Sequence, residues 1–310
     1  MKALVTGGAG FIGTNIVRQL LVMGHETVIL DNLSSGYARN LVSEAKFIEG
    51  DIRDKAAVER AISGCEVVFN LAASVGNKRA IDNPLDDSDI NVLGLLQVLE
   101  AARRHGIKKI VQSSSAGIFG ELKTLPIAED HPQEPDTPYG VSKLAGEKHC
   151  LAYNKLYGME NVCLRYFNVY GPHQRFDAYG NVIPIFATCV LDGKPITIFG
   201  DGEQTRDFVH VSDVAAANIS SALTKGVQGV FNIGSATRVT INELVSIIVT
   251  AAGTDIEIFH GPLRPGDVRD SLADIHTARA VFGYSPGMNL SESINEYLCW
   301  LKADRLSTRC

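Results

Sequence analysis

The first thirteen residues constrain the fold more than any other part of the chain. A short apolar run, Ala3–Thr6, leads directly into a turn with glycines at positions 7, 10 and 13, and a helix-forming segment, Phe11–Leu21, follows. A strand that passes through such a turn into a helix presents bare backbone N–H groups and a helix N-terminus, which together bind pyrophosphate. Gly7 permits the tight turn, Gly10 lets phosphates approach the main chain, and Gly13 lets helix and strand pack closely. The opening therefore predicts a dinucleotide-binding unit.

A carboxylate further along the chain supports this interpretation. The glycine spacing is G-x-x-G-x-x-G rather than G-x-G-x-x-G, and a glycine turn alone is often only a turn. Asp31, however, ends a second apolar run, Glu26–Leu30, at roughly the distance of about 20 residues that the dinucleotide pattern requires. A carboxylate there accepts hydrogen bonds from the adenosine ribose 2′-hydroxyl and repels a 2′-phosphate. We therefore expect NAD, not NADP, as the cofactor.

The first two thirds of the chain alternate between short apolar runs and helix-forming segments. Strands are predicted at Ala3–Thr6, Glu26–Leu30, Lys46–Glu49, Val67–Leu71, Ile110–Ser113 and Val162–Arg165. Helices are predicted at Phe11–Leu21, Lys55–Ile62, Asp89–His105 and Tyr139–Tyr157. Regular βαβ alternation with apolar strands is typical of a parallel sheet covered on both faces. We therefore predict an α/β fold with a Rossmann-type doubly wound parallel sheet that binds ligands at the carboxyl ends of its strands.

From about Gly171 the pattern becomes irregular. Stretches rich in glycine, proline and aspartate separate short predicted helices at Val182–Leu191, Ser212–Leu223, Ile241–Ala252 and Ser291–Lys302. We predict an NAD-binding Rossmann domain over residues 1–170, onto which some later segments pack back. A smaller, irregular α/β lobe over residues 171–310 is expected to supply a substrate pocket at the cleft between the two parts.

The composition excludes several classes of protein. The 310 residues carry a net charge of −6 and no run of Lys or Arg longer than two, which argues against a surface for nucleic acid or anionic membranes. Apolar runs are too short to span a bilayer, and a core strand predicted within three residues of Met1 leaves no room for a signal peptide. The six cysteines form no C-x-x-C pair, and the eight histidines form no H-x-x-x-H or H-E-x-x-H. We expect a cytoplasmic protein with reduced thiols and no metal site.

Two groups of residues point to acid–base chemistry. Tyr139 and Lys143 stand at i and i+4 of a predicted helix and so share one face of it. A nearby ammonium favours the phenolate, so we expect Lys143 to lower the pKa of Tyr139 enough for proton transfer near neutrality. Ser113–Ser115 ends a predicted strand at the ligand-binding edge, where a hydroxyl could bridge a substrate hydroxyl and the tyrosine. Each pattern alone is common by chance, but their occurrence in one chain favours acid–base catalysis.

A set of further motifs runs through the whole chain. These are Thr6–Gly13, Asp31–Leu33 with Ser35–Gly36, Gly50–Ile52, Asn70–Ala73, Ser113–Ser115, Tyr139 with Lys143, Arg165–Asn168, Arg206–Asp207 and Arg264–Asp267. In these motifs the sequence resembles the extended short-chain dehydrogenase/reductase family, in particular the nucleotide-sugar branch typified by UDP-glucose 4-epimerases. Asn70, where relatives commonly have His, and Phe119, where Tyr is common, depart from the family pattern without touching a catalytic role.

The resemblance implies a role for residues along the whole chain. Asp51 and Ile52 would hold the adenine, and Lys143 would also bind the nicotinamide ribose. The implied NAD-binding residues are Gly7, Gly10, Phe11, Ile12, Gly13, Asp31, Asn32, Asp51, Ile52, Leu71, Ala72, Ala73, Asn91, Ser113, Tyr139, Lys143 and Tyr166. The implied substrate-binding residues are Ser115, Tyr139, Asn168, Asn181, Val182, Phe199, Arg206, Arg264, Asp267 and Ser271.

The implied reaction is transient oxidation at sugar C4 of a UDP-sugar. Tyr139, Lys143 and Ser115 would be the catalytic residues, and NAD would be regenerated in each turnover. Arg206 and Arg264 would hold the substrate diphosphate in bidentate fashion, and Asp267 would hold the uridine ribose. The alternative for these arginines is pairing with Asp207 and Asp267 on a solvated surface.

Other functions remain open at this stage. Ser115 is followed by Ala116–Ile118, where the related 4,6-dehydratases carry an Asp–Glu pair. The sequence therefore favours an epimerase over a 4,6-dehydratase. Decarboxylation of UDP-glucuronate, its 4-epimerisation with Arg175 as carboxylate partner, and GDP-sugar chemistry are further alternatives. A non-catalytic scaffold that binds NAD is another alternative, but such a protein would not need the complete set of catalytic residues.

The resemblance also predicts the size of the substrate and the assembly of the protein. In the family, the position of Ser271 limits the size of the group at sugar C2, and a small serine predicts room for an N-acetyl group in UDP-GlcNAc or UDP-GalNAc. The resemblance also implies a homodimer built from Asp89–His105 and Tyr139–Tyr157. Both segments carry apolar residues on more than one face, as a helix buried on two sides requires.

Overall fold

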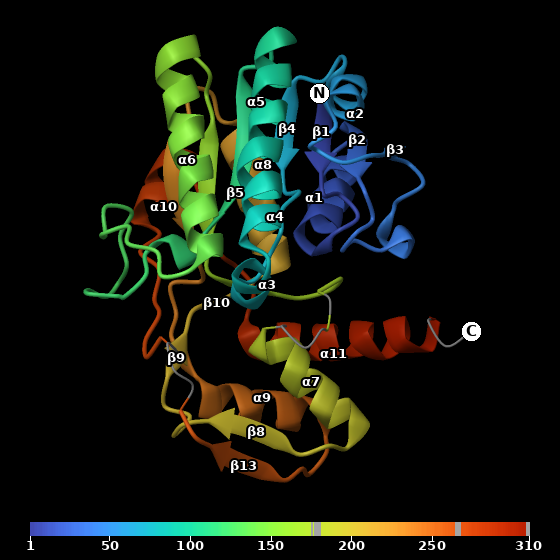
Figure 1. Cartoon of the computed structure of the whole chain (residues 1–310). Helices are drawn as coiled ribbons and strands as arrows, with labels where there is room; N and C mark the ends of the chain where they lie inside the picture. The colour runs from blue at the N-terminus through green and yellow to red at the C-terminus, as the bar shows by residue number, and fades with distance from the viewer. Residues whose placement is uncertain (175, 177–180, 264–267, 308–310) are drawn as a thin grey trace.

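The computed structural model describes residues 1–174, 176, 181–263 and 268–307. Its centre is a seven-stranded parallel sheet with the strand order β3-β2-β1-β4-β5-β6-β11 (Figure 1). The strands are β1 (Lys2–Thr6), β2 (Glu26–Asp31), β3 (Lys46–Glu49), β4 (Val67–Asn70), β5 (Lys109–Ser115), β6 (Val162–Tyr166) and β11 (Gly229–Ile233). The predicted doubly wound fold is confirmed. The strand order reverses between β1 and β4, which is where ligands bind in sheets of this kind.

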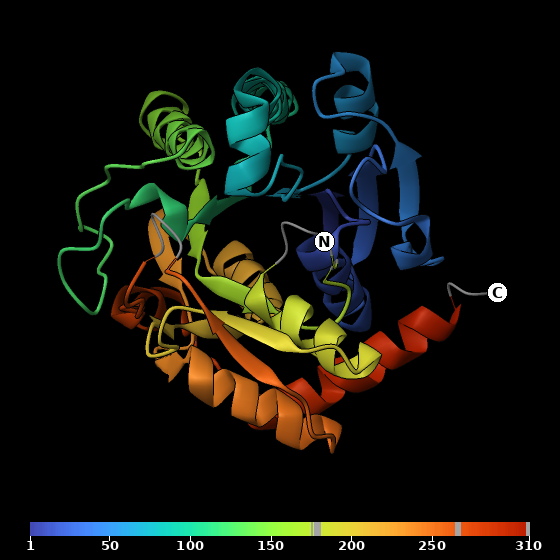
Figure 2. The same ribbon diagram turned by 60° about the horizontal axis from the view of Figure 1, so that its bottom comes forward.

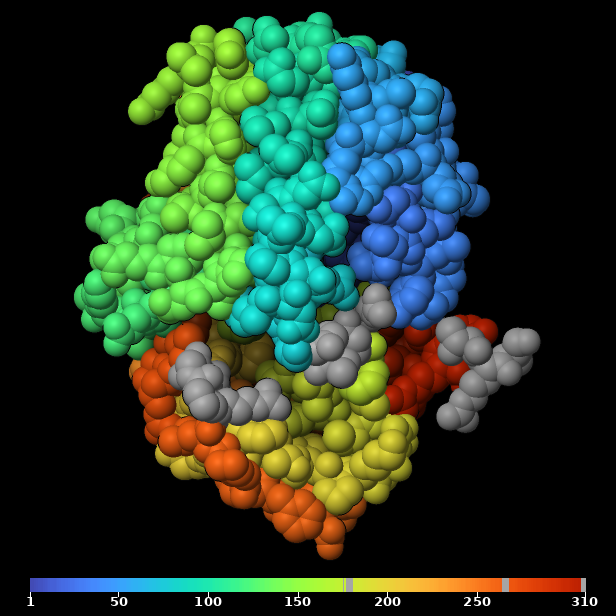
Figure 3. All heavy atoms as spheres, viewed as in Figure 1, coloured from blue at the N-terminus to red at the C-terminus, as the bar shows by residue number. Residues whose placement is uncertain are grey.

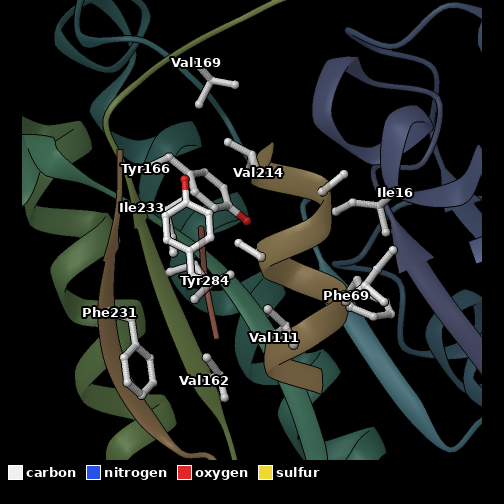
Figure 4. Close-up of a cluster of buried hydrophobic side chains, with 14 of the residues drawn as sticks. Ile16, Phe69, Val111, Val162, Tyr166, Val169, Val214, Phe231, Ile233 and Tyr284 are labelled. Atoms are coloured by element: carbon white, nitrogen blue, oxygen red, sulfur yellow. The ribbon is translucent and has the colours of Figure 1, made fainter. Parts of the chain in front are cut away.

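Helices cover both faces of the sheet because alternate strand residues point to opposite sides. Val5 and Phe69 face one apolar cluster, whereas Leu4 and Val68 face the other. The first cluster is closed by α1 (Phe11–Val22), α8 (Val211–Leu223) and α10 (His276–Phe282). The second is closed by α2 (Lys55–Ile62), α5 (Leu95–Arg104) and α6 (Pro138–Tyr157). Figure 4 shows the first cluster, where Val214 of α8 lies among side chains of the sheet.

A smaller lobe lies beside the carboxyl edge of the sheet (Figures 1 and 3). It contains α7 (Val182–Asp192), β8 (Ile196–Phe199), α9 (Ile241–Ala252), β13 (Ile258–Gly261) and α11 (Leu290–Ser307). β8 and β13 pair in parallel, and a third apolar cluster, including Phe186, Leu244 and Tyr297, fills the space between these elements. In Figure 2 this lobe lies on the same side of the sheet as α1.

The chain passes between the two lobes more than once. After β8 it returns through β10 (Phe208–His210), which pairs with β7 (Asn168–Tyr170), and then through α8 and β11 to the main sheet. It re-enters the smaller lobe at β12 (Val239–Thr240), which pairs with β9 (Thr205–Arg206). Three of these later elements, α8, β11 and α10, pack on or join the main sheet.

Capping residues fix most helix ends at or near the positions predicted from the sequence. Thr137 caps α6 by accepting a hydrogen bond from the Gly140 N–H, with Pro138 in the first turn, and Gly158 ends the helix in the left-handed conformation. Thr240 and Glu243 form a reciprocal capping box at the start of α9.

One helix differs from expectation in a way that affects the site. The helix expected at Asp89–His105 begins earlier, with α4 (Pro84–Ser88), because Pro84 suits the first helical turn. A π-helical segment, Asp89–Gly94, then joins α4 to α5. A separate short helix, α3 (Asn77–Asp82), lies before α4 and was not expected from the sequence.

Two further observations concern the described residues only. None of their helices is both long and apolar enough to cross a membrane. Their cysteines, Cys65, Cys150, Cys163, Cys189 and Cys299, are free thiols.

Candidate active site

The glycine turn after β1 has the close packing that its sequence predicts. Gly7 has a φ of +68°, and a Cβ there would lie 2.7 Å from the Ala72 nitrogen. A Cβ on Gly13 would lie 2.1 Å from the Gly7 carbonyl oxygen, so no side chain fits at this position. Gly10 precedes the first residue of α1 and offers no side-chain cap. The first N–H groups of α1 are therefore left to a ligand.

Asp31 ties this turn to the end of β2. Its Oδ2 accepts a hydrogen bond from the Ala9 N–H at 2.9 Å, and its Oδ1 accepts one from the Leu33 N–H at 2.8 Å. Burial raises the pKa of the Asp31 carboxyl, an effect that these two backbone bonds oppose. Each carboxylate oxygen keeps a further lone pair with which to accept a ribose hydroxyl.

A second acid, Asp51, lies beyond the end of β3. The Arg53 guanidinium holds it by hydrogen bonds and lowers the pKa of Asp51 to about 2. Asn32 also donates to Asp51 Oδ2 at 2.8 Å. Asp51 is therefore charged, and its position is fixed by both neighbours.

The residues expected to bind the cofactor surround one cavity, with a single exception. The lining residues include Gly7, Gly10, Phe11, Ile12, Gly13, Asp31, Asn32, Asp51, Ile52, Leu71, Ala72, Ala73, Ser113, Tyr139, Lys143 and Tyr166. Asn91 does not line the cavity. It is buried in the π-helical segment, where its amide group bonds Ser74, Asp87 and Ser142. Its neighbour Ile90 lines the cavity instead.

Two polar residues that the sequence interpretation missed also line the cavity. Arg79 of α3 is half-buried, and none of the described residues pairs with its guanidinium. Gln174 is buried and donates to the Val169 carbonyl, but its Oε1 has no hydrogen-bond partner among the described residues. The guanidinium of Arg79 suits the phosphates of a dinucleotide, and the Gln174 Oε1 suits its hydroxyl donors. The sequence places Arg79 shortly after β4, at the ligand-binding edge, which is the signal that could have identified it.

Tyr139 and Lys143 line this cavity where the nicotinamide ribose is expected, and Ser115 is hydrogen-bonded to Tyr139. Lys143 Nζ donates to the Ser113 carbonyl at 3.0 Å and lies 3.3 Å from the Ser113 hydroxyl. It also lies 5.8 Å from the centre of the Tyr139 ring. Ser115 accepts a hydrogen bond from the Gly117 N–H at 3.1 Å and is hydrogen-bonded to Tyr139. The three side chains are therefore held together on β5 and α6.

Electrostatics at this cluster differ from the sequence-based expectation. Burial raises the pKa of Tyr139 to about 12, and the bond with Ser115 opposes this shift only in part. Burial also lowers the pKa of Lys143 to about 8. The expectation that Lys143 lowers the pKa of Tyr139 toward neutrality is not met, because burial of the phenol dominates the shift. A further positive charge at the phenol would shift this pKa downward.

The residues expected to bind substrate are only partly gathered at this cavity. Asn181 lines it together with Tyr139. Ser115, Asn168, Val182, Phe199, Arg206 and Ser271 do not line it. Arg264 and Asp267, like Arg175, lie outside the described residues.

Asp207 is a structural residue. It is fully buried and accepts hydrogen bonds from Ser235, Ala236 and Ala273. The alternative in which Arg206 pairs with Asp207 on a solvated surface is therefore wrong. Asn168 and Arg206 instead flank Asp207 on β7 and β9, with the Asn168 amide donating to the Asp207 carbonyl.

The glycine turn, the acid at the end of β2 and the Tyr–Lys–Ser cluster all lie within the part of the chain that matches a known family. Its model, the NAD dependent epimerase/dehydratase family, matches residues 3–234. The chain belongs to this family. The predicted cofactor, NAD, is thereby confirmed, as is the expectation of an enzyme of this epimerase family.

Several members of the family with similar sequences or structures are named as epimerases, and others as dTDP-glucose 4,6-dehydratases. A putative UDP-glucose 4-epimerase from Methanocaldococcus jannaschii is 42% identical over 301 residues, which cover 96% of this chain and 98% of that protein. The crystal structure of the UDP-glucose 4-epimerase from Thermotoga maritima with UDP-glucose has a TM-score of 0.94 at 37% identity, covering 98% of this chain and 100% of that one. A UDP-N-acetylglucosamine 4-epimerase from Methanobrevibacter ruminantium, in complex with UDP-N-acetylmuramic acid, has a TM-score of 0.94 at 35% identity. It covers 98% of each chain.

Proposed function

We propose that this protein is a UDP-sugar 4-epimerase that interconverts UDP-glucose and UDP-galactose with tightly bound NAD. The observation that carries the proposal is the meeting of Tyr139, Lys143 and Ser115 at the end of a cavity lined by the glycine turn and Asp31. A scaffold that only binds a dinucleotide has no physical need for this cluster.

Three side chains carry out the proton transfer in the proposed reaction. Tyr139, as phenolate, takes the proton of the sugar 4-hydroxyl, and the Ser115 hydroxyl bridges the phenol and sugar oxygens. Bound NAD would supply the acceptor and donor for the hydride of sugar C4, so that the chain's own residues have only the proton to move. Tyr139 then returns the proton. Lys143, charged below its pKa of about 8, supplies a positive charge to the site.

Retention of the cofactor follows from the residues around it. Asp31 and Asn32 would hold the adenosine ribose, the N-terminus of α1 the pyrophosphate, and Lys143 the nicotinamide ribose. Arg79 and Gln174 add a cation and an acceptor to the same cavity. The smaller lobe would hold the UDP group through Asn168, Asn181, Val182, Phe199 and Arg206, with Arg264 and Asp267 outside the described residues.

A panel of UDP-sugars tests the proposal directly. The purified protein, without added NAD, should convert UDP-glucose to UDP-galactose, with products resolved by NMR or ion-exchange chromatography. Net oxidation that requires added NAD would contradict the proposal. So would loss of the C6 oxygen from UDP-glucose, or release of carbon dioxide from UDP-glucuronate. The last two outcomes would identify a 4,6-dehydratase or a decarboxylase of the same family.

The same panel tests the predicted room for an N-acetyl group. Ser271 is buried and small, so UDP-GlcNAc should be converted to UDP-GalNAc at a measurable rate. Ser271→Tyr should lower the ratio of kcat/KM for UDP-GlcNAc to that for UDP-glucose, because a large side chain would occupy that space. No turnover of UDP-GlcNAc at high enzyme concentration would refute the prediction.

The apolar surface of two helices supports a homodimer. The segments expected to form it, Asp89–His105 and Tyr139–Tyr157, carry four apolar residues that are exposed in the single chain: Leu93, Val141, Leu156 and Tyr157. We expect sedimentation equilibrium to give twice the mass of the chain, and Leu93→Glu to give the mass of one chain, because a buried unpaired charge is costly. Leu263→Glu, on an exposed residue of the smaller lobe, is the matched control and should leave the mass unchanged. A wild-type protein that sediments as a single chain would exclude the dimer.

A further inference from the structure

Asp87 is a buried acid that the proposed reaction does not use. It lies on α4 and is only 1% exposed. Its Oδ2 accepts a hydrogen bond from the Ser142 hydroxyl at 2.6 Å, and its Oδ1 accepts one from the Asn91 amide at 3.1 Å. Both donors are uncharged, although a buried carboxylate normally requires a cation nearby.

Ser142 connects Asp87 to the catalytic helix. It stands on α6 directly before Lys143 and three residues after Tyr139, whose carbonyl lies 3.0 Å from the Ser142 hydroxyl. Asn91 completes the network by donating to Ser142 Oγ at 3.0 Å and by bonding both backbone groups of Ser74. The network therefore fastens α6 to α4, to the π-helical segment and to the loop after β4 that lines the cavity.

Lys143 is the complementary buried charge. It is 4% exposed, and its described hydrogen bonds go to the uncharged carbonyl and hydroxyl of Ser113. Asp87 and Lys143 are thus two opposite buried charges, each bonded only to neutral groups among the described residues. The negative charge of Asp87 raises the pKa of Lys143 and also that of Tyr139.

Several of the other charges on the neighbouring helices have partners of their own, whereas Arg79 has none among the described residues. Asp86 and Asp89 both pair with Arg53 at the surface, at 3.2 Å and 3.0 Å. On α3, Lys78 pairs with Asp82 at 2.8 Å, and Arg79 lines the cavity. On α6, Glu147 is fully buried in an ion pair with Arg165 at 2.9 Å.

We propose that Asp87 is a positioning residue that keeps Lys143 protonated and, through Ser142, holds the start of α6 against the cavity. This role rests on the proposed function, since it serves the proton transfer at Tyr139. It makes Lys143 a cation at the pH where the phenol must give up and take back its proton. Asp87 itself touches neither of the reacting groups.

Titration of Lys143 tests the proposal without relying on turnover. The pKa of Lys143 can be followed by NMR of 13Cε-labelled lysine in the purified holoenzyme, with its signal assigned by its absence in Lys143→Met. Asp87→Asn should shift the midpoint to lower pH by about one unit or more, because removing an opposite charge favours the neutral amine. The alkaline limb of the kcat profile for UDP-glucose should move in the same direction.

Ser142→Ala is the matched control. It removes the bond between α6 and Asp87 but keeps the charge, so the Lys143 midpoint should stay within a few tenths of a pH unit while the melting temperature falls. Asp87→Ser is a second neutral variant in case Asp87→Asn does not fold. A Lys143 midpoint that is unchanged in the neutral variant would overturn the proposal and leave Asp87 with a structural role only. If the wild type shows no epimerisation but the midpoint shifts, the proposed function fails while the coupling of Asp87 to Lys143 stands.

Discussion

Tyr139→Phe should lower the rate of UDP-glucose epimerisation by about 10²–10⁴-fold or more while leaving NAD bound. The phenol oxygen is the only atom removed, and it is the group that would exchange a proton with the sugar 4-hydroxyl. The ring remains to fill its place beside Lys143 and Gly117, so the cavity keeps its shape. Rates with UDP-glucose, and the NAD released on denaturation, measure the two effects separately.

Tyr157→Phe provides the control on the same helix. Tyr157 is 45% exposed and lies at the end of α6, far along the helix from the site. Its activity should equal that of the wild type. Epimerisation by Tyr139→Phe at more than a tenth of the wild-type rate would mean that another group transfers the proton.

Gly13→Ala should give a protein that is purified without NAD and is inactive. The added Cβ would lie 2.1 Å from the Gly7 carbonyl oxygen and 2.9 Å from the Gly8 Cα, and both contacts are with backbone that cannot rotate away. The turn must therefore move from the N-terminus of α1, where the pyrophosphate would bind. Overpacking of this kind costs about 1–3 kcal/mol, so the melting temperature should fall as well.

Gly287→Ala is the corresponding control for a glycine-to-alanine change. A Cβ at Gly287 meets nothing within 4 Å, so this variant should retain NAD and its stability. If Gly13→Ala binds NAD as tightly as the wild type, the glycine turn does not hold the cofactor.

The parts of the site that could be predicted from the sequence depend on local geometry. Gly7 and Gly13 lie in one turn, and the i, i+4 spacing of Tyr139 and Lys143 fixes their shared face wherever the helix packs. The bounds of α2, α9 and β3 follow from apolar periodicity and capping residues, and agree with prediction. These features need no knowledge of distant segments.

The predictions that failed depend on distant partners. The sequence predicts that Asn91 lines the cofactor cavity. In the π-helical segment its side chain instead lies in the core, where it bonds Asp87 and Ser142. The pKa of Tyr139 depends on how completely the phenol is buried, which no spacing reveals. The strands β9 and β12 have two residues each, too few for a periodic pattern, and form only because the chain brings them together.

The repeated passage of the chain between the lobes has a consequence for protein engineering. Residues 211–233, which form α8 and β11, belong to the main sheet and its covering helix, although they interrupt the smaller lobe in sequence. Exchanging the smaller lobe with that of a relative therefore cannot be done with a single splice point. A functional chimaera would need two grafts, one on each side of residues 211–233, and a fusion at Gly171 alone should also replace β11 of the recipient sheet. Substrate specificity in this architecture is thus more readily altered by point substitutions than by recombination of contiguous segments.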